Sequence, residues 1–238
     1  MITPNDRKIA FRIYLYLGAL FITSLVVSNL IFQKFFSWKP FGDFTVFGAP
    51  LFEISAGVLP YPITFLITDL ISEIYGKKKA NEVVTAGIFA SVFSMGIIFI
   101  ANKVPAIASS PIDNKTFTEV FGLSPLGVLA SMLAYLFAQY IDISIYHFWK
   151  NLTHGKYLWL RNNFSTFSSQ FADTFTVVGL LCIFEVLPWD KFYGLVISGF
   201  LFKISIAFLD TPFLYLFVYL LRKYFNLKVG EEIPLDQS

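Results

Sequence analysis

Six long apolar stretches dominate the sequence and restrict what the chain can fold into. They run roughly over Ala10–Phe32, Ser55–Tyr75, Val83–Ala101, Pro125–Phe148, Phe164–Leu187 and Phe192–Leu221. A helix of about 20 apolar residues crosses the hydrocarbon core of a bilayer, and lipid offers no partner to unpaired backbone groups. We therefore predict an all-α, polytopic membrane protein, with one domain over residues 1–238 that forms a bundle of six transmembrane helices.

The overall composition excludes a soluble globular protein. The chain is 56% hydrophobic and only 14% charged, with a mean hydropathy of +0.65, whereas soluble domains carry about 25% charged residues. The net charge of +2, without a basic stripe, does not indicate nucleic-acid binding. One cysteine and two histidines offer neither a disulfide nor the spacing of a zinc site, so we expect no metal and no cofactor.

The distribution of lysine and arginine predicts the orientation. Of these 18 residues, twelve lie at the start of the first segment, after the second, after the fourth, or after the sixth. Five lie in the other connections, and Lys203 lies inside the sixth segment. Because cytoplasmic loops carry the excess of positive charge, we predict that both termini are cytoplasmic. The polar tail after Tyr224 is expected to be loose.

Two carboxylates lie near the end of the second segment. Asp69 and Glu73 are four residues apart, which puts them on one face of a helix, and three lysines follow at 77–79. A carboxylate inside a bilayer costs roughly 2.5–3.5 kcal/mol, so it normally faces a bundle interior or a wet cavity. We interpret Asp69 as a binding residue. For Glu73 two interpretations stay open: binding, or pairing with a lysine at the cytoplasmic edge. Upstream, Pro60 and Pro62 should break the outer half of the segment.

The fourth segment carries a single polar stripe. Its members follow one another at helical spacings of four, three and four residues, and they are Tyr135, Gln139, Asp142 and Tyr146. Gln139 and Asp142 are candidate binding residues. Asp142 lies toward the cytoplasmic third of the segment, so pairing between helices is an equally open interpretation for it.

The fifth and sixth segments supply the remaining polar candidates. In the fifth, the stripe is preceded by Arg161 and includes Ser169, Gln170, Asp173 and Thr174. An amide and an acid at helical spacing favour a binding surface over the usual bonding of Ser and Thr to their own backbone. Lys203 lies deep in the sixth segment, where it needs a carboxylate partner whether its role is structural or functional.

These side chains suit a planar, hydrogen-bonding solute. A carboxylate accepts two adjacent N–H groups of a guanine-like edge, an amide or lysine donates to its carbonyl, and an aromatic ring stacks on it for roughly 1–3 kcal/mol. Amino acids, polyamines and vitamins fit almost as well. An intramembrane enzyme is disfavoured, because the sequence has no nucleophile elbow and no metal-binding helix motif.

The motifs also resemble those of a known family. The run ITDLISEIYGKKKA over 67–80 is similar to the signature of bacterial queuosine precursor transporters, which are grouped with vitamin uptake transporters. Further similar positions follow in the same order and cover nearly the whole chain: Asn29; Gln139 and Asp142; Arg161, Ser165, Ser169, Gln170, Asp173 and Thr174; and Lys203, Thr211 and Pro212.

The resemblance implies import of 7-deazaguanine precursors, such as the cyano and aminomethyl forms, across the cytoplasmic membrane for tRNA modification. It implies a substrate site drawn from Asn29, Asp69, Glu73, Gln139, Asp142, Arg161, Ser169, Gln170, Asp173, Thr174 and Lys203. By this analogy Asp69 or Asp173 accepts from the ring N–H groups, Gln170 donates to the carbonyl, and Lys203 orients or neutralises an acid.

The energy source stays open in the sequence. There is no Gly-x-x-x-x-Gly-Lys-Ser/Thr phosphate loop, so we do not expect this chain to hydrolyse ATP. The chain is then a secondary carrier, or the binding subunit of an ATP-driven vitamin uptake complex whose ATPases are separate chains. A general nucleobase or vitamin carrier, and a homodimer, are further alternatives.

Overall fold

The computed structural model describes residues 4–32, 34–37, 42, 45–46, 49–50, 53–122, 125–185 and 187–235. In this part of the chain the architecture is a bundle of long helices, which confirms the all-α membrane-type fold. The helices are α1 (Pro4–Ile31), α2 (Tyr61–Ile74), α3 (Gly76–Lys103), α4 (Asn114–Phe121), α5 (Pro125–Leu152), α6 (Leu158–Ile183) and α7 (Phe192–Phe225).

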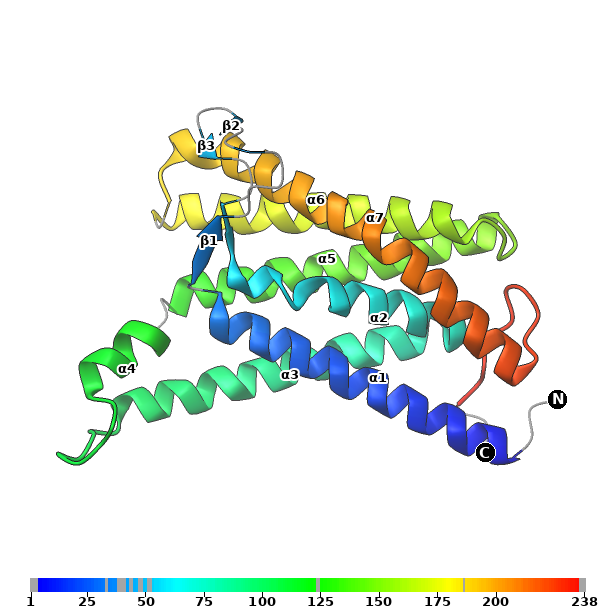
Figure 1. The fold of residues 1–238 in the computed structure, drawn as a ribbon, viewed down its shortest axis with the longest axis horizontal. Coiled ribbons are helices and arrows are strands. Elements are labelled where there is room, and N and C mark those ends of the chain that lie inside the picture. Colours follow the sequence, from blue (N-terminus) through cyan, green and yellow to red (C-terminus); the bar gives the residue numbers. More distant parts are fainter. Residues whose placement is uncertain are drawn as a thin grey trace.

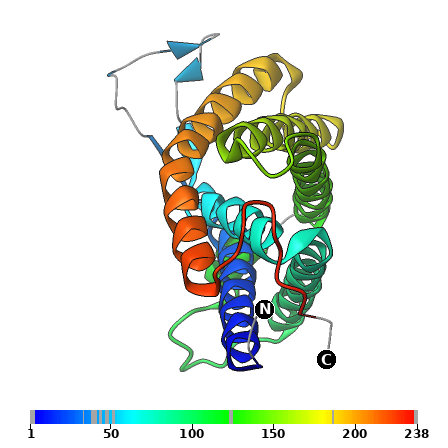
Figure 2. The same ribbon diagram turned by 90° about the vertical axis from the view of Figure 1, so that its right-hand side faces the viewer.

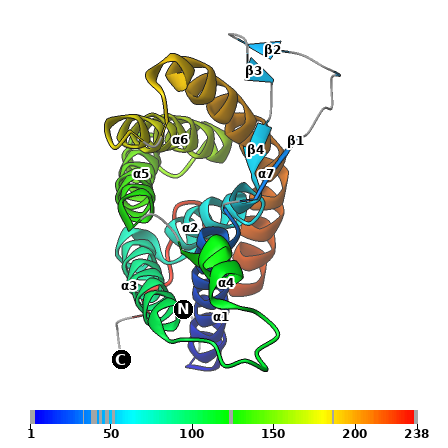
Figure 3. The ribbon, with the colours of Figure 1, turned by 90° about the vertical axis from the view of Figure 1, so that its left-hand side faces the viewer.

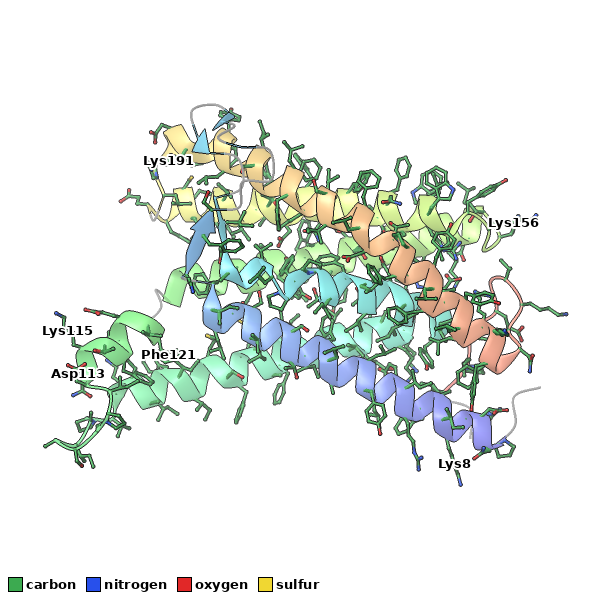
Figure 4. The ribbon with its side chains drawn as sticks, viewed as in Figure 1. Lys8, Asp113, Lys115, Phe121, Lys156 and Lys191 are labelled. Carbon is green, nitrogen blue, oxygen red and sulfur yellow. The ribbon has the colours of Figure 1, made fainter. Side chains whose placement is uncertain are left out.

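The chain termini lie at the same end of the bundle, on the right in Figure 1. We call this the terminal end, and the opposite end, which carries the short strands and α4, the hairpin end (Figure 3). Figure 4 places Lys8 and Lys156 at the terminal end and Lys115 and Lys191 at the hairpin end, which separates these lysines as the predicted topology requires.

Among the described residues, five helical segments are long and apolar enough to cross a membrane: α1, α3 and α6, the stretch Ala56–Ile74 that contains α2, and the stretch Trp189–Phe225 that contains α7. The predicted span Pro125–Phe148 corresponds to α5, a helix of 28 residues. The count of six crossings and the cytoplasmic position of the termini stay predictions. Most helices extend past the predicted apolar segments, because helix geometry continues into the polar flanks.

Two small antiparallel strand pairs lie at the hairpin end. β1 (Phe35–Ser37) pairs with β4 (Glu53–Ser55), and β2 (Thr45–Val46) pairs with β3 (Ala49–Pro50). The sequence analysis did not predict these strands, nor α4, whose first turn is capped by Asp113 accepting from the Thr116 amide at 2.8 Å. These elements lie in or at the edge of the connections between the predicted apolar segments, and with two to eight residues each they are too short to be recognised by apolar length.

The central helix, α2, is short and begins at the predicted break. A 3-10 turn, η1 (Ala56–Val58), precedes it, and Pro60 and Pro62 occupy its N-cap and second position, which confirms the break. With 14 residues, α2 is about 21 Å long, shorter than the ~30 Å hydrocarbon core. Figure 2 shows α2 surrounded by the other long helices, and every residue from Ile67 to Ile74 is buried.

The tail after α7 is ordered up to residue 235 and packs across the terminal end (Figure 2), so the expectation of a loose tail was wrong. Ile233 is fully buried, and its backbone amide donates to the Ile74 carbonyl at 2.7 Å. The ammonium of Lys150 donates to the carbonyls of Ser72 and Glu73 at 3.2 Å each. The last carbonyls of α2, which a helix leaves unpaired, are therefore satisfied from outside the helix.

Candidate functional site

A cavity of about 660 Å³ lies in the hairpin half of the bundle. It lies beside the start of α2, where Gly57, Val58 and Tyr61 form part of its wall, and the short α2 leaves this space open. Its polar lining comes from five helices and includes Asn29, Ser91, Tyr135, Asp173, Thr174 and Lys203. Pockets of 300–1,000 Å³ with an apolar wall and a few placed polar groups are typical of small-molecule sites.

An ion pair crosses the wall of this cavity. Asp173 of α6 accepts from the ammonium of Lys203 of α7 through Oδ2, and that ammonium lies 4.8 Å from the centre of the Tyr61 ring. Asp173 Oδ1 and the Thr174 hydroxyl are buried without a hydrogen-bond partner among the described residues. The carboxylate is therefore half satisfied, and it keeps one acceptor oxygen for a ligand.

Gln170 lies one turn of α6 nearer the terminal end. It lines a second, smaller cavity of about 20 Å³ together with Tyr61, Lys203 and Asp210, a volume that suits a single water molecule. Its Oε1 has no partner in the part of the chain that the structure describes. Lys203 and Tyr61 border both cavities, so Gln170 lies near the larger cavity without lining it.

A buried acid pair, Asp69 of α2 and Asp142 of α5, lies between the cavity and the terminal end. The two carboxyl groups are within hydrogen-bonding reach of each other. Ser169 donates to Asp142 Oδ1 at 3.0 Å. Gln139, one turn along α5, donates to the Tyr135 hydroxyl at 2.7 Å, and Tyr135 lines the cavity. A chain of polar contacts thus leads from the cavity wall to the neighbourhood of the acid pair.

The Glu73 network seals the terminal end. Glu73 Oε1 lies 2.7 Å from Arg161 Nη2 and 2.6 Å from Arg222 Nη2. Its Oε2 accepts from the Tyr146 hydroxyl at 2.9 Å and lies 3.8 Å from Lys150 Nζ. The Glu73 and Arg161 side chains are each only 1% exposed. One carboxylate therefore ties α2 to α5, α6 and α7.

Two cations of the Glu73 network also contact residues outside the long helices. Arg161 Nη1 donates to the carbonyls of Gly155 and Lys156 at 2.9 and 2.8 Å, and so fixes the loop between α5 and α6. Lys150 Nζ lies 2.6 Å from Glu232 in the tail. The loop and the tail are thus held by the same charged groups that join the helices.

The structure distributes the predicted site residues over three levels. Asn29, Asp173, Thr174 and Lys203 line the large cavity, with Gln170 at the small one. Asp69, Gln139, Asp142 and Ser169 form the buried level below. Glu73 and Arg161 belong to the terminal network. Their roles in binding stay predictions.

The sequence did not predict several residues of these levels as site residues, among them Tyr61, Lys150 and Arg222. Lys150 continues the polar stripe of α5 four residues after Tyr146, a signal that was present in the spacing. Tyr61 follows the first proline of the broken segment and has no polar neighbour in the sequence to mark it. In the sequence, Arg222 is indistinguishable from the other basic residues that flank the last apolar segment.

The aromatic walls of the cavity can hold a flat ring. Tyr61 and Tyr135 meet edge to face, with ring centres 5.3 Å apart. Among the described residues, no group of three or more His, Cys, Asp or Glu side chains is placed to hold a metal ion. The arrangement can bind a planar solute by hydrogen bonds and stacking.

Comparisons with known proteins identify the family. The family model described as "Putative vitamin uptake transporter" matches residues 55–217. A protein of Bacillus subtilis (strain 168), named "Probable queuosine precursor transporter", is 32% identical over 170 residues, which cover 69% of this chain and 72% of that protein. No solved structure matches the chain.

The family and the fold together give the broad function. The protein is a membrane transporter and not an enzyme, because the matched family consists of transporters. With its long apolar helices it is a multi-pass protein of the cytoplasmic membrane that carries a small-molecule solute. By the extent of both matches, the chain belongs to the putative vitamin uptake transporter family.

Proposed function

We propose that this transporter imports 7-deazaguanine precursors of queuosine, such as the cyano and aminomethyl bases. The relative from Bacillus subtilis carries this substrate class in its name. The single observation that supports it in this chain is the half-satisfied Asp173 carboxylate in the wall of the large cavity. Guanine-like bases present two adjacent N–H donor groups. The unpaired Oδ1 of Asp173 accepts from one, and the second lone pair of Oδ2, beside the Lys203 ammonium, accepts from the other.

The cavity assigns a role to each nearby side chain. Asp173 accepts from the ring N–H groups, and Lys203, which already holds its other oxygen, orients the carboxylate. Tyr61 or Tyr135 stacks on the ring, and Asn29 and Thr174 offer further polar contacts. Of the two acids considered for this task, Asp173 is favoured, because Asp69 lines neither of the two cavities.

The two ends of the bundle suggest the direction of access. The cavity lies in the hairpin half, on the side predicted to face outward, while the Glu73 network closes the predicted cytoplasmic side. In this conformation a solute arrives from outside, and its release inward requires the Glu73 network to open. Broken helices that end near a mid-membrane site are a recurring feature of transporters.

A second candidate is a broader vitamin or nucleobase carrier. The family description names vitamins, and a cavity of about 660 Å³ accepts molecules larger than a single base. A homodimer or separate ATPase chains remain alternatives for the assembly. Substrate binding to the isolated chain distinguishes these functions without assuming an energy source.

The test is a competition experiment with the purified protein in lipid nanodiscs. Labelled 7-aminomethyl-7-deazaguanine is expected to bind, to be displaced by the cyano form, and to be displaced poorly by thiamine. Guanine tests the selectivity of the site. Equal displacement by guanine would replace the proposal with a general nucleobase carrier, and displacement by thiamine alone would replace it with a vitamin carrier.

A further inference from the structure

Among the residues that the structure describes, neither member of the acid pair forms an ion pair with a lysine or arginine. Asp69 is 2% exposed and Asp142 fully buried, and they come from different helices, α2 and α5. One oxygen of each, Oδ1 of Asp69 and Oδ2 of Asp142, has no hydrogen-bond donor from any described residue. An ionised carboxylate accepts hydrogen bonds and donates none, so two ionised carboxylates in contact cannot form a hydrogen bond with each other.

Other unpartnered polar atoms share the faces of the pair. Gln139 is fully buried with a vacant Oε1 and lies three residues before Asp142 on α5. Ser72 is fully buried with an unpaired hydroxyl and lies three residues after Asp69 on α2. Residues three apart lie on one face of a helix. The surroundings of the acid pair therefore contain buried polar atoms that have no hydrogen-bond partner among the residues that the structure describes.

The charges around the pair do not neutralise both acids. Among the described residues of the helices packed against the pair, the groups that interact with it are Tyr135, Tyr146, Arg161 and Asp210. Arg161 is the cation among them, and Glu73 already engages it. The sequence of α1 between 13 and 31, and that of α3 between 83 and 102, contains no Asp, Glu, Lys, Arg or His.

Two buried carboxyl groups in contact are stable when they share one proton, because like charges at this range cannot both ionise in a medium of low dielectric. Intramembrane acids in this situation are typical of proton pathways. The geometry points to a proton-binding site at Asp69 and Asp142 that couples solute uptake to inward proton movement, an inference that rests on the transport function proposed above.

The same geometry links the proton to the Glu73 network. Loss of the proton leaves two negative charges in contact, and the nearest cation is Arg161, whose buried Nε has no partner among the described residues. Attraction toward the deprotonated pair draws Arg161 away from Glu73. One proton enters from the outer side and leaves to the cytoplasm, so opening of the terminal end and proton release become one event.

The experiment uses the full-length protein reconstituted in liposomes with labelled 7-aminomethyl-7-deazaguanine and the membrane potential clamped. A gradient of about 2 pH units, acidic outside, is expected to drive accumulation of up to roughly 100-fold for one proton per solute. A pH dye outside should report alkalinisation on addition of solute. Solute uptake that does not depend on the pH gradient and is not accompanied by proton movement would refute the proton-binding site but not the transport function.

Variants then assign the effect to the pair. Asp142→Asn cannot form the doubly charged pair, so it should abolish gradient-driven accumulation and solute-linked proton movement but retain binding of the labelled solute in nanodiscs, and Asp142→Glu should restore part of the accumulation. The matched control is Asp190→Asn, which alters an exposed acid at the hairpin end and should behave as wild type. Gradient-driven accumulation by Asp142→Asn equal to wild type would overturn the assignment. Wild-type protein that exchanges no solute under any condition would refute the proposed function instead.

Discussion

The two halves of the bundle contain the same kinds of charged side chain but arrange them differently. In the hairpin half, Asp173 has one cation, one spare oxygen and a cavity beside it. In the terminal half, Glu73 has two arginines, a lysine and a tyrosine, and no oxygen is left over. Under the proposed function, the number of partners, rather than the presence of an acid, distinguishes the site that receives the solute from the one that holds helices together.

The largest effect is expected from breaking the saturated half. Glu73→Gln leaves Arg161 and two further cations without their shared counter-charge, and removing one member of a buried pair costs about 3–5 kcal/mol. The free energy of unfolding in detergent should fall by that amount. Glu82→Gln, at an exposed pair with Lys79, serves as control and should change it by less than about 1 kcal/mol. Equal effects of the two changes would contradict the contrast.

The next effect is expected in the half-satisfied site. Asp173→Asn removes the charged acceptor, and a hydrogen bond to a charged group is worth about 1.5–3 kcal/mol, roughly a 10- to 150-fold loss of solute affinity. Nanodisc binding measures this loss. Because the change also strands Lys203, the double variant Asp173→Asn/Lys203→Met is made alongside it. Stability should recover in the double variant while affinity does not, and recovery of both would argue against Asp173 as a ligand.

A smaller effect should follow from the aromatic wall. Tyr61→Leu removes the ring beneath the Lys203 ammonium and one face for stacking, worth about 1–3 kcal/mol of binding. Tyr61→Phe keeps the ring and should retain most of the affinity. Titration of both variants with the same labelled base compares them directly. A loss in Tyr61→Phe as large as in Tyr61→Leu would assign the effect to the hydroxyl and not to the ring.

The smallest effect is expected at the rim of the terminal end. Glu232 is 41% exposed, so Glu232→Gln should cost at most about 1 kcal/mol of stability. It should nevertheless loosen the tail, which hydrogen–deuterium exchange over residues 227–235 reports. Exchange unchanged from wild type would show that the remaining contacts of the tail, including the Ile233 backbone hydrogen bond and the buried Ile233 side chain, hold it without Glu232.

The sequence was sufficient for the bundle because apolar length and charge asymmetry act locally along each segment. It also predicted the break at Pro60 and Pro62, since proline restricts its own backbone wherever it occurs. It was not sufficient to divide the acids into levels. In the sequence, Asp69, Glu73 and Asp173 are all acids within apolar segments. Only the packing of the helices decides which of them meets Arg161, Asp142 or Lys203.

The tail that completes the end of α2 has a consequence for biosynthesis. Residues 227–235 leave the ribosome after all the long helices, yet the Ile233 amide and the Glu232–Lys150 contact finish the packing around Ile74. Until these residues dock, the Ile74 carbonyl at the end of α2 lacks the donor that the tail supplies. A truncation before Ile233 should therefore destabilise the packing around the end of α2, although it removes no part of the long helices.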